Sequence, residues 1–198
     1  MKTSVRAELA QLAEVAGRVA LEMDGEIQQL VDLVLATMRG GGKVLFCGNG
    51  GSAADAQHLA AEYVVRFARD REALPALALT TDTSILTAVG NDLGFDRVFE
   101  RQIRALGRRG DLLVLHSTSG RSQNLLSAAG AARELGLKTA ALLAGGGGAL
   151  RSRVDLALVV PTESTARAQE LHLAIGHVVC ELVDRAWSKE PEGVDVVG

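Results

Sequence analysis

The apolar residues near the start of the chain recur at helical intervals, which predicts a long helical segment over residues 4–38. Val15 and Val19 belong to this pattern, and polar residues fill most positions between its apolar members. Gly17 and Gly25 are points at which the segment can bend or divide into two helices. An amphipathic segment of this length needs a cover for its apolar face, and either a partner subunit or its own domain would supply one.

Short, uninterrupted apolar runs alternate with helical patterns through the rest of the chain. Such runs are typical of strands in a parallel sheet buried on both faces, so we predict an α/β fold. The five predicted strands are residues 43–47, 76–79, 112–116, 138–143 and 156–160. The predicted helices are residues 53–67, a short helix closed by Gly90-Asn91-Asp92, residues 95–106, a helix ending near 135, and residues 165–187.

Composition and charge describe a single globular domain and argue against nucleic acid as a partner. The chain has 198 residues, 47% hydrophobic and 23% charged, and no repeat or linker divides it. Its net charge of −3 contrasts with the basic patch that a nucleic-acid binder usually carries. Only 3% of the residues are aromatic, which leaves few platforms for base stacking.

The sequence contains no pattern that directs it to a membrane. No run of about 18 uncharged apolar residues suggests a membrane span, and the first residues lack the apolar core of a signal peptide. We therefore expect a cytoplasmic protein without a membrane partner. In that compartment Cys47 and Cys180 are expected to be buried free thiols.

Two polar loops each follow a predicted strand. Residues 48–52 follow the first strand, and residues 117–122 follow the third. Ligands of open parallel sheets bind beyond the carboxyl ends of the strands, where hydroxyl and backbone N–H groups at a helix start hold phosphate well. The alternative is that both loops are ordinary turns with serine caps. Neither loop has the lysine of a P-loop, and Gly-x-Gly-x-x-Gly is absent after the first strand, which disfavours a dinucleotide.

His58 and Glu62 lie four residues apart on a predicted helix, so their Cβ atoms should be about 5–6 Å apart. This spacing suits two ligands of one zinc-like ion, and it equally suits a plain hydrogen bond on the helix surface. The last helix adds Gln169 and His177, which are separated by a rise of about 12 Å. Joint ligation from one helix is therefore strained, and two subunits or different roles would relieve it.

Four segments of the chain, taken together, closely resemble one known family. They are residues 48–58, 81–92, 117–120 and 169–172, and the resemblance extends in order over nearly the whole chain. The family is that of the sedoheptulose 7-phosphate isomerases, also called phosphoheptose isomerases, within the SIS (sugar isomerase) group. The serine loop alone would indicate only a sugar-phosphate-binding SIS domain.

The resemblance implies a fold, an activity and an assembly. The fold is a single SIS domain over residues 1–198, a flavodoxin-like αβα sandwich with five parallel strands. Within it, residues 1–38 form an N-terminal helical segment, 39–188 the α/β core and C-terminal helix, and 189–198 a tail. The activity is aldose–ketose isomerisation of sedoheptulose 7-phosphate to D-glycero-D-manno-heptose 7-phosphate, and the assembly is a homotetramer with active sites at subunit interfaces. The alternative is a non-catalytic SIS protein that senses a sugar phosphate or binds a replication initiator.

The resemblance also implies roles for individual residues. Glu62 and His177 match the catalytic base and acid. The positions that bind one zinc ion per subunit are His58, Glu62, Gln169 and His177. The positions that surround the substrate are Asn49, Gly50, Gly51, Ser52, Glu62, Arg66, Asn91, Asp92, Ser117, Thr118, Ser119, Ser122 and Gln169.

Three places depart from the family pattern. Ala166 stands where some members have an acidic residue, and residues 145–148 are four glycines in place of a turn that usually contains threonine. His116 precedes the serine loop, where small or apolar residues are usual. These differences bear on sugar preference and stereochemistry, and not on the implied acid, base or metal positions.

Overall fold

The computed structural model describes residues 4–187, so the tail predicted over 189–198 lies outside the described residues. Its centre is a five-stranded, all-parallel sheet with strand order β2-β1-β3-β4-β5. The strands are β1 (Val44–Gly48), β2 (Ala76–Ala78), β3 (Leu112–Ser117), β4 (Lys138–Leu143) and β5 (Leu156–Val159). Every residue of β1 and β3 is buried, which is why these strands read as uninterrupted apolar runs. The five predicted strands are confirmed, each to within one residue at either end.

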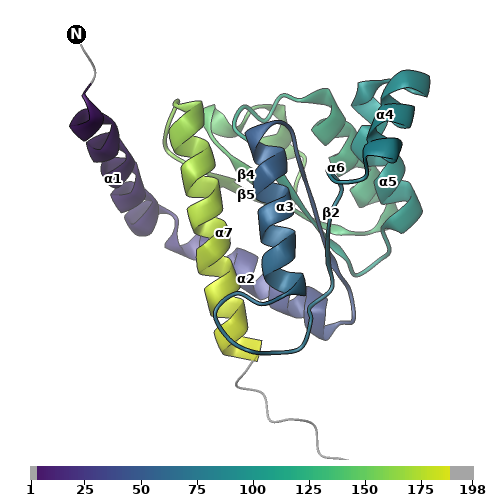
Figure 1. Ribbon diagram of the computed structural model, residues 1–198, viewed down its shortest axis with the longest axis horizontal. Coiled ribbons are helices and arrows are strands. Elements are labelled where there is room, and N and C mark those ends of the chain that lie inside the picture. Colours follow the sequence, from purple (N-terminus) through teal and green to yellow (C-terminus); the bar gives the residue numbers. More distant parts are fainter. Residues whose placement is uncertain (1–3, 188–198) are drawn as a thin grey trace, which may run out of the picture.

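Helices cover both faces of the sheet, which confirms the predicted αβα sandwich (Figure 1). Successive strand residues point to opposite faces, so Val44 and Phe46 join one core cluster and Leu45 and Cys47 the other. The first cluster includes residues of α1 (Val5–Glu22), α2 (Asp24–Arg39), α3 (Gly51–Val64) and α7 (Thr165–Trp187). The second includes residues of α4 (Thr83–Asp92), α5 (Val98–Leu106) and α6 (Gln123–Leu135).

The N-terminal segment divides into two helices at Met23, and neither Gly17 nor Gly25 marks the break. Met23 leaves the helical conformation at φ −123° and ψ 10°, and its buried side chain belongs to the core. The N–H of Met23 donates the last hydrogen bond of α1, to the Val19 carbonyl. The Met23 carbonyl accepts a hydrogen bond from the N–H of Ile27 in α2. Core packing of a large side chain, rather than glycine flexibility, therefore sets the bend.

Several predicted helix boundaries were wrong by a few residues. Helix α3 spans Gly51–Val64 rather than 53–67, because the chain already turns into it at Gly50 with φ +57° and leaves it at Val65. Helix α4 continues through Asn91 and Asp92, which the prediction had placed after its end. The predicted helix 95–106 begins as a separate 3₁₀ turn, η1 (Phe95–Arg97).

Cys47 and Cys180 are buried free thiols, as predicted. Among residues 4–187, no helix is both long enough and apolar enough to span a bilayer.

Candidate functional site: a three-donor group and a serine loop

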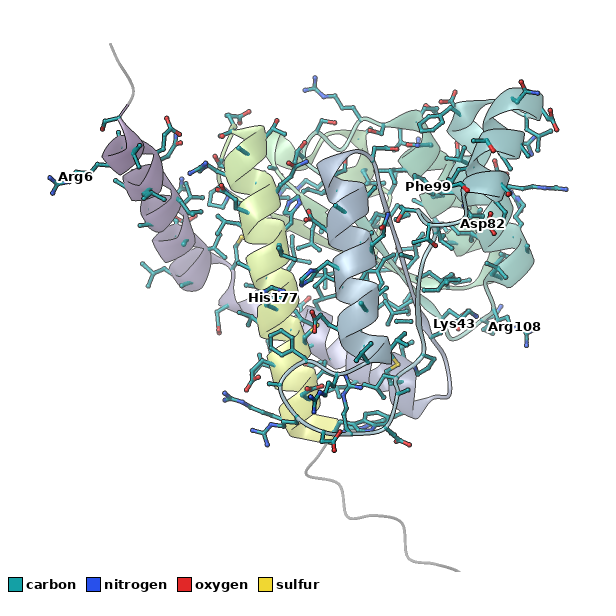
Figure 2. All side chains as sticks on the ribbon, in the orientation of Figure 1. Arg6, Lys43, Asp82, Phe99, Arg108 and His177 are labelled. Carbon is teal, nitrogen blue, oxygen red and sulfur yellow. The ribbon has the colours of Figure 1, made fainter. Side chains whose placement is uncertain are left out.

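Three titratable side chains from two helices meet at one point. His58 and Glu62 come from α3, and His177 comes from α7, where Figure 2 labels it. The Nε2 atoms of the two histidines are 2.8 Å apart, and Nε2 of His58 is 3.2 Å from Oε1 of Glu62. One ligand atom from each residue lies within 4.8 Å of the other two. The structure therefore brings together three of the four residues that the sequence offered as metal ligands.

Close packing of α3 against α7 creates this meeting point. Gly176 lies against Leu59, and a Cβ atom at position 176 would be 2.5 Å from the leucine side chain. Because Leu59 and Gly176 directly adjoin His58 and His177 in sequence, the contact sets the spacing of the two imidazoles. The Phe67 ring packs near His177 on one side of the three-donor group, with the two ring centroids 5.4 Å apart.

The donor set fits a zinc ion. Zinc takes histidine nitrogen and carboxylate oxygen at about 2.0–2.2 Å, so two of its tetrahedral ligands lie about 3.3 Å apart. The His58–Glu62 distance of 3.2 Å already matches this value, and the His58–His177 distance of 2.8 Å needs a widening of about half an ångström. The His58 and Glu62 side chains are 45% and 22% exposed, so the group can be reached by a small molecule.

Gln169 lies on the same helix interface, at the start of α3. A Cβ atom at Gly51 would be 2.6 Å from Nε2 of Gln169, so only glycine at position 51 leaves room for the carboxamide. Gly51 is two helical turns before His58, and Gln169 is eight residues before His177. Ligation of the metal by Gln169 stays a prediction, while its contact with the first polar loop is a finding.

The serine loop lies at the carboxyl end of β3 and leads into α6. Its hydroxyl groups divide into two kinds. Ser117 is buried and its Oγ accepts the N–H of Gly120, so this hydroxyl braces the loop itself. Ser122 is the N-cap residue of α6 but makes no side-chain cap bond, which leaves its hydroxyl available to a ligand. The N–H groups and dipole of the α6 N-terminus favour an anion at this point.

The four-glycine turn supports the serine loop from behind. Gly120 has φ +61°, and a Cβ atom there would overlap the carbonyl of Gly147. A Cβ atom at Gly148 would likewise overlap the carbonyl of Ser119, and the N–H of Leu150 donates to the Gly120 carbonyl over 2.9 Å. The glycines that depart from the family pattern therefore allow two backbones to lie in direct contact, a role that sequence reasoning missed.

A hollow of about 190 Å³ opens between the serine loop and the start of α7. Two charged residues that the sequence did not single out line it, Arg121 and Glu163. The other polar residues that line it are Thr118, Ser119, Ser164 and Thr165. Hydroxyl groups and opposite charges at the edge of a phosphate-type loop suit a polyhydroxylated ligand.

The first polar loop is held by a reciprocal pair of hydrogen bonds. The carboxamides of Asn49 and Asn124 donate to each other over 3.0 and 2.8 Å. Each amide keeps one further N–H and one lone pair, so Asn49 can still contact a ligand. Ser52 is buried in the first turn of α3, and Gly48 packs under it with room for no Cβ atom.

Three predicted site residues lie on the surface and are not part of the three-donor group. Arg66 follows the end of α3 and faces Asp70 over 3.9 Å, with 61% of its side chain exposed. Asn91 and Asp92 are exposed at the end of α4 and hydrogen-bond to each other over 2.7 Å. Helix α4 packs on η1 and α5. Their roles at the site stay predictions.

A pair of buried histidines lies beneath the serine loop. His116 and His172 are fully buried, with ring centroids 6.2 Å apart and an edge-to-face arrangement. His172 bonds the Leu143 carbonyl over 3.1 Å, whereas neither ring nitrogen of His116 has a hydrogen-bond partner among the described residues. Burial lowers the pKa of His116 to about 3 and that of His172 to about 4. Both rings are therefore neutral at physiological pH, and they support the ends of β3 and β4.

Comparisons with known proteins agree with this architecture. The sequence model of the SIS domain family matches residues 9–144. The phosphoheptose isomerase of Roseiflexus sp. is 55% identical over 83% of each chain. The solved phosphoheptose isomerase of Neisseria gonorrhoeae superposes with a TM-score of 0.87 at 44% identity, covering 91% of this chain and 97% of that one. The solved phosphoheptose isomerase of Francisella tularensis superposes with a TM-score of 0.89 at 38% identity, covering 91% of this chain and 96% of that chain. With its five-stranded parallel sheet and His–Glu–His group, the chain belongs to the phosphoheptose isomerases, which are aldose–ketose isomerases of the SIS domain family.

Proposed function

We propose that the chain interconverts sedoheptulose 7-phosphate and D-glycero-D-manno-heptose 7-phosphate through an enediol, with one zinc ion per subunit. The observation that carries the proposal is the convergence of His58, Glu62 and His177 between α3 and α7, in a fold whose serine loop at the start of α6 is suited to phosphate. The relatives named phosphoheptose isomerase support the class of substrate.

The reaction needs a base and an acid within reach of two neighbouring carbons. Moving the carbonyl from C2 to C1 removes a proton from C1, delivers one to C2, and transfers a hydroxyl proton between the two oxygens. Glu62 takes the carbon-bound proton, and His177 acts as the partner acid. Their placement on two packed helices supports these roles, because one ligand atom of each lies within 4.8 Å of the other.

Zinc binding would use the same group. His58, Glu62 and His177 would hold the ion, with Gln169 as the further ligand that family resemblance implies. When bound, the ion supplies Lewis-acid stabilisation of the negative charge that develops on substrate oxygen. A carboxylate has two oxygens, so Glu62 keeps one for proton transfer when the other faces the ion.

The polar loops would position the substrate. Ser122, Thr118 and Ser119 would contact the phosphate at the α6 N-terminus, with Ser117 bracing the loop from beneath. Asn49, Gly50 and Gly51 would line the sugar, assisted by Ser52 at the start of α3. A phosphate fixed at one end of the sugar holds C1 and C2 near Glu62 and His177, which lowers the entropy cost of reaching the transition state.

Assembly into a homotetramer is part of the proposal. Val5 and Leu9, which lie one turn apart on α1, are 80% and 60% exposed and present an apolar surface that a second subunit would cover. Active sites at the subunit interfaces would also give Arg66, Asn91 and Asp92 a route to a substrate bound on a neighbouring chain. The partners are therefore a sugar phosphate and further copies of the same chain, with no nucleic acid or membrane.

Incubation with sedoheptulose 7-phosphate, followed by NMR, tests the proposed reaction. We expect the anomeric signals of an aldoheptose 7-phosphate to grow until a constant ratio of ketose to aldose is reached. Fructose 6-phosphate is the control, because it has the same ketose group and phosphate on a shorter carbon chain. Equal turnover of both sugars would contradict the assigned substrate, and turnover of neither would contradict the assigned reaction.

A further inference from the structure

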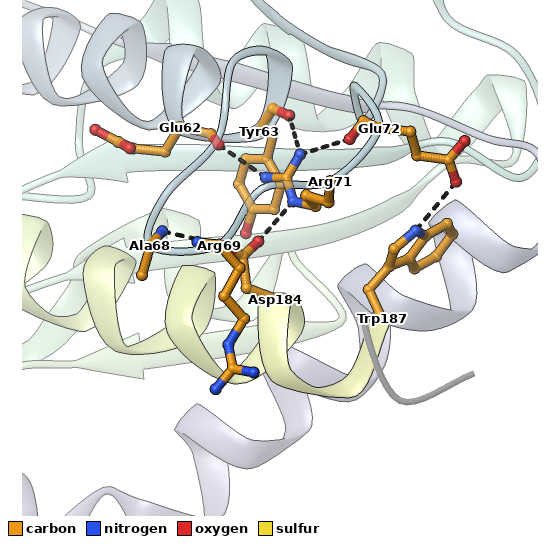
Figure 3. A network of polar contacts seen from close by, with 8 residues as sticks. All are labelled: Glu62, Tyr63, Ala68, Arg69, Arg71, Glu72, Asp184 and Trp187. Atoms are coloured by element: carbon orange, nitrogen blue, oxygen red, sulfur yellow. Dashed lines mark hydrogen bonds and ion pairs between the residues drawn. The ribbon is translucent and has the colours of Figure 1, made fainter. Parts of the chain in front are cut away.

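The segment that follows α3 is held by a buried arginine that sequence analysis did not single out. Figure 3 shows Arg71 enclosed between the end of α3 and α7. Its Nε donates to Oδ1 of Asp184 over 2.7 Å, and the two side chains are 5% and 1% exposed. The network also includes Trp187, whose indole N–H donates to Glu72 over 3.2 Å.

Arg71 completes the C-terminus of the helix that carries Glu62. The last carbonyls of a helix have no partner within it, and α3 has no basic residue in its last turn. The guanidinium fills this place by donating to the carbonyls of Glu62 and Tyr63 over 2.9 Å each. A further bond reaches the Glu72 carbonyl, so four of its five N–H groups are used. The backbone of the proposed base is thus bonded directly to Arg71.

Asp184 connects the same network to the helix that carries His177. It lies seven residues, or two helical turns, after His177 on α7. Its second carboxylate oxygen accepts the N–H groups of Ala68 and Arg69 over 3.2 and 3.4 Å. One buried ion pair therefore ties the end of α3, the segment after it, and α7 to one another.

Two fixed contacts of the helix pair hold the donor group. Gly176 packs against Leu59 at the level of the two histidines, and Arg71 bonds Asp184 two helical turns further along α7. Loss of the second contact would free the end of α3 to move relative to α7. The separation of Glu62 and His177 depends on that movement, because one side chain comes from each helix.

We propose that Arg71 and Asp184 are positioning residues that set the separation of Glu62 and His177, and with it the affinity of the site for its metal ion. This inference rests on the proposed function for its catalytic consequence, but its geometric and metal-binding consequences stand independently. Groups that orient metal ligands from outside commonly change metal affinity by about 10–100-fold when replaced.

The test compares R71K and D184N with a matched control, D111N. Lysine keeps a positive charge but lacks the planar fork that reaches two carbonyls, and asparagine keeps the shape of Asp184 without its charge. Asp111 is a similar buried carboxylate that accepts two backbone N–H groups and one cation, Lys43. Its partners Lys43 and Arg108 lie outside α3 and α7, so its loss should cost stability without moving the donor group.

Affinity for Zn²⁺ and for Co²⁺ alone is measured by competition with a chromophoric chelator, together with the visible spectrum of the Co²⁺ form. We expect R71K and D184N to bind both ions at least tenfold more weakly, to shift the Co²⁺ spectrum, and to lower kcat more than they change KM. D111N should keep the metal affinity and the Co²⁺ spectrum of the parent protein, even if it loses as much thermal stability as R71K and D184N. Parental affinity and spectrum in folded R71K and D184N would overturn the proposal.

A crystal structure of R71K provides a second, metal-independent measurement. We expect the Nε2 atoms of His58 and His177, now 2.8 Å apart, to separate by about 1 Å, a scale on which misplacement costs roughly a hundredfold in rate. An unchanged separation would contradict the positioning role. A parent protein that binds metal but does not isomerise sedoheptulose 7-phosphate would instead contradict the proposed function and leave this comparison valid.

Discussion

The Nε2 atoms of His58 and His177 lie 2.8 Å apart although 119 residues separate them in the sequence. Both nitrogens point to one place, and Oε1 of Glu62 is 3.2 Å from the first of them. Two imidazole nitrogens at this distance must share a proton or a cation, because two lone pairs facing each other would repel. The proposed metal-assisted isomerisation depends on this relationship.

Replacing Glu62 with glutamine should abolish turnover. The carboxamide keeps the shape of the side chain but cannot accept the C1 proton, and loss of a general base typically costs about 10²–10⁴-fold in rate. The measurement is kcat with sedoheptulose 7-phosphate, alongside the melting temperature and binding of inorganic phosphate, both of which should match the parent. Full activity in this variant would exclude Glu62 as the base.

Treatment with a chelator should remove about one metal ion per chain and lower the activity, and added zinc should restore it. The physical reason is that three donors within 4.8 Å of one another form an open site rather than a buried, closed one. Elemental analysis before and after treatment counts the ions. Purified protein that holds no metal and is fully active would refute the zinc assignment.

Gly51→Ala should reduce activity more than stability. The new Cβ atom would lie 2.6 Å from Nε2 of Gln169, so the carboxamide must leave its position between α3 and α7. Gly17→Ala is the matched control, because a Cβ atom there meets nothing within 4 Å and alanine favours a helix interior by about 1 kcal/mol. Assays of kcat and melting temperature on both variants should show loss of activity only in the first. Parental kcat in G51A would show that the position of Gln169 does not matter to catalysis.

Gly120→Ala should prevent formation of the serine loop. Position 120 has φ +61°, and its Cβ atom would overlap the Gly147 carbonyl, so the substitution combines backbone strain with a clash that no side-chain rotation can relieve. We expect phosphate protection against thermal unfolding to disappear. Gly130→Ala on the exposed face of α6 meets nothing within 4 Å and should leave that protection intact. Protection by phosphate in G120A equal to the parent would refute the assignment of the loop.

The protein should lose stability as the pH falls from about 6.5 toward 4. His116 and His172 have pKa values of about 3 and about 4 in the fold, lowered by burial from 6.5, so the unfolded chain takes up protons in this range that the native state does not. Each histidine then lowers the free energy of unfolding by up to about 1.4 kcal/mol for every pH unit of acidification in this range. Urea midpoints across this range measure the slope, and His116→Leu should reduce it. An equal slope in the parent and the variant would contradict the burial argument.

The sheet and its helices were predictable because the signal for them is local. Residues 44–48 and 112–117 are buried on both faces, so their apolar character shows in the sequence without reference to any partner. The bend at Met23 was missed because it follows from core packing, whereas glycine only permits a bend. The end of α3 at Val64 was missed because its last carbonyls are bonded by the side chain of Arg71. Arg71 lies in a segment without helical or strand periodicity, so nothing in the sequence indicates this contact.

The site was predictable as a set of residues but not as an arrangement. The spacing of His58 and Glu62 on one helix was visible, and their distance of 3.2 Å confirms it. The approach of His177 depends on how α3 packs on α7, and Gly176 determines that packing without any residue pattern that would show it. The support of the serine loop by the glycine turn was hidden for the same reason, since it is a contact between two backbones.

The most direct test of the account is the reaction of sedoheptulose 7-phosphate in D₂O, followed by ¹H and ¹³C NMR. Because Glu62 and His177 exchange protons with solvent at an open site, the account predicts D-glycero-D-manno-heptose 7-phosphate that carries deuterium at C2. Aldoheptose formed without any deuterium at C2 would indicate direct hydride transfer. That result, or the absence of aldoheptose, would contradict proton transfer by this pair of residues.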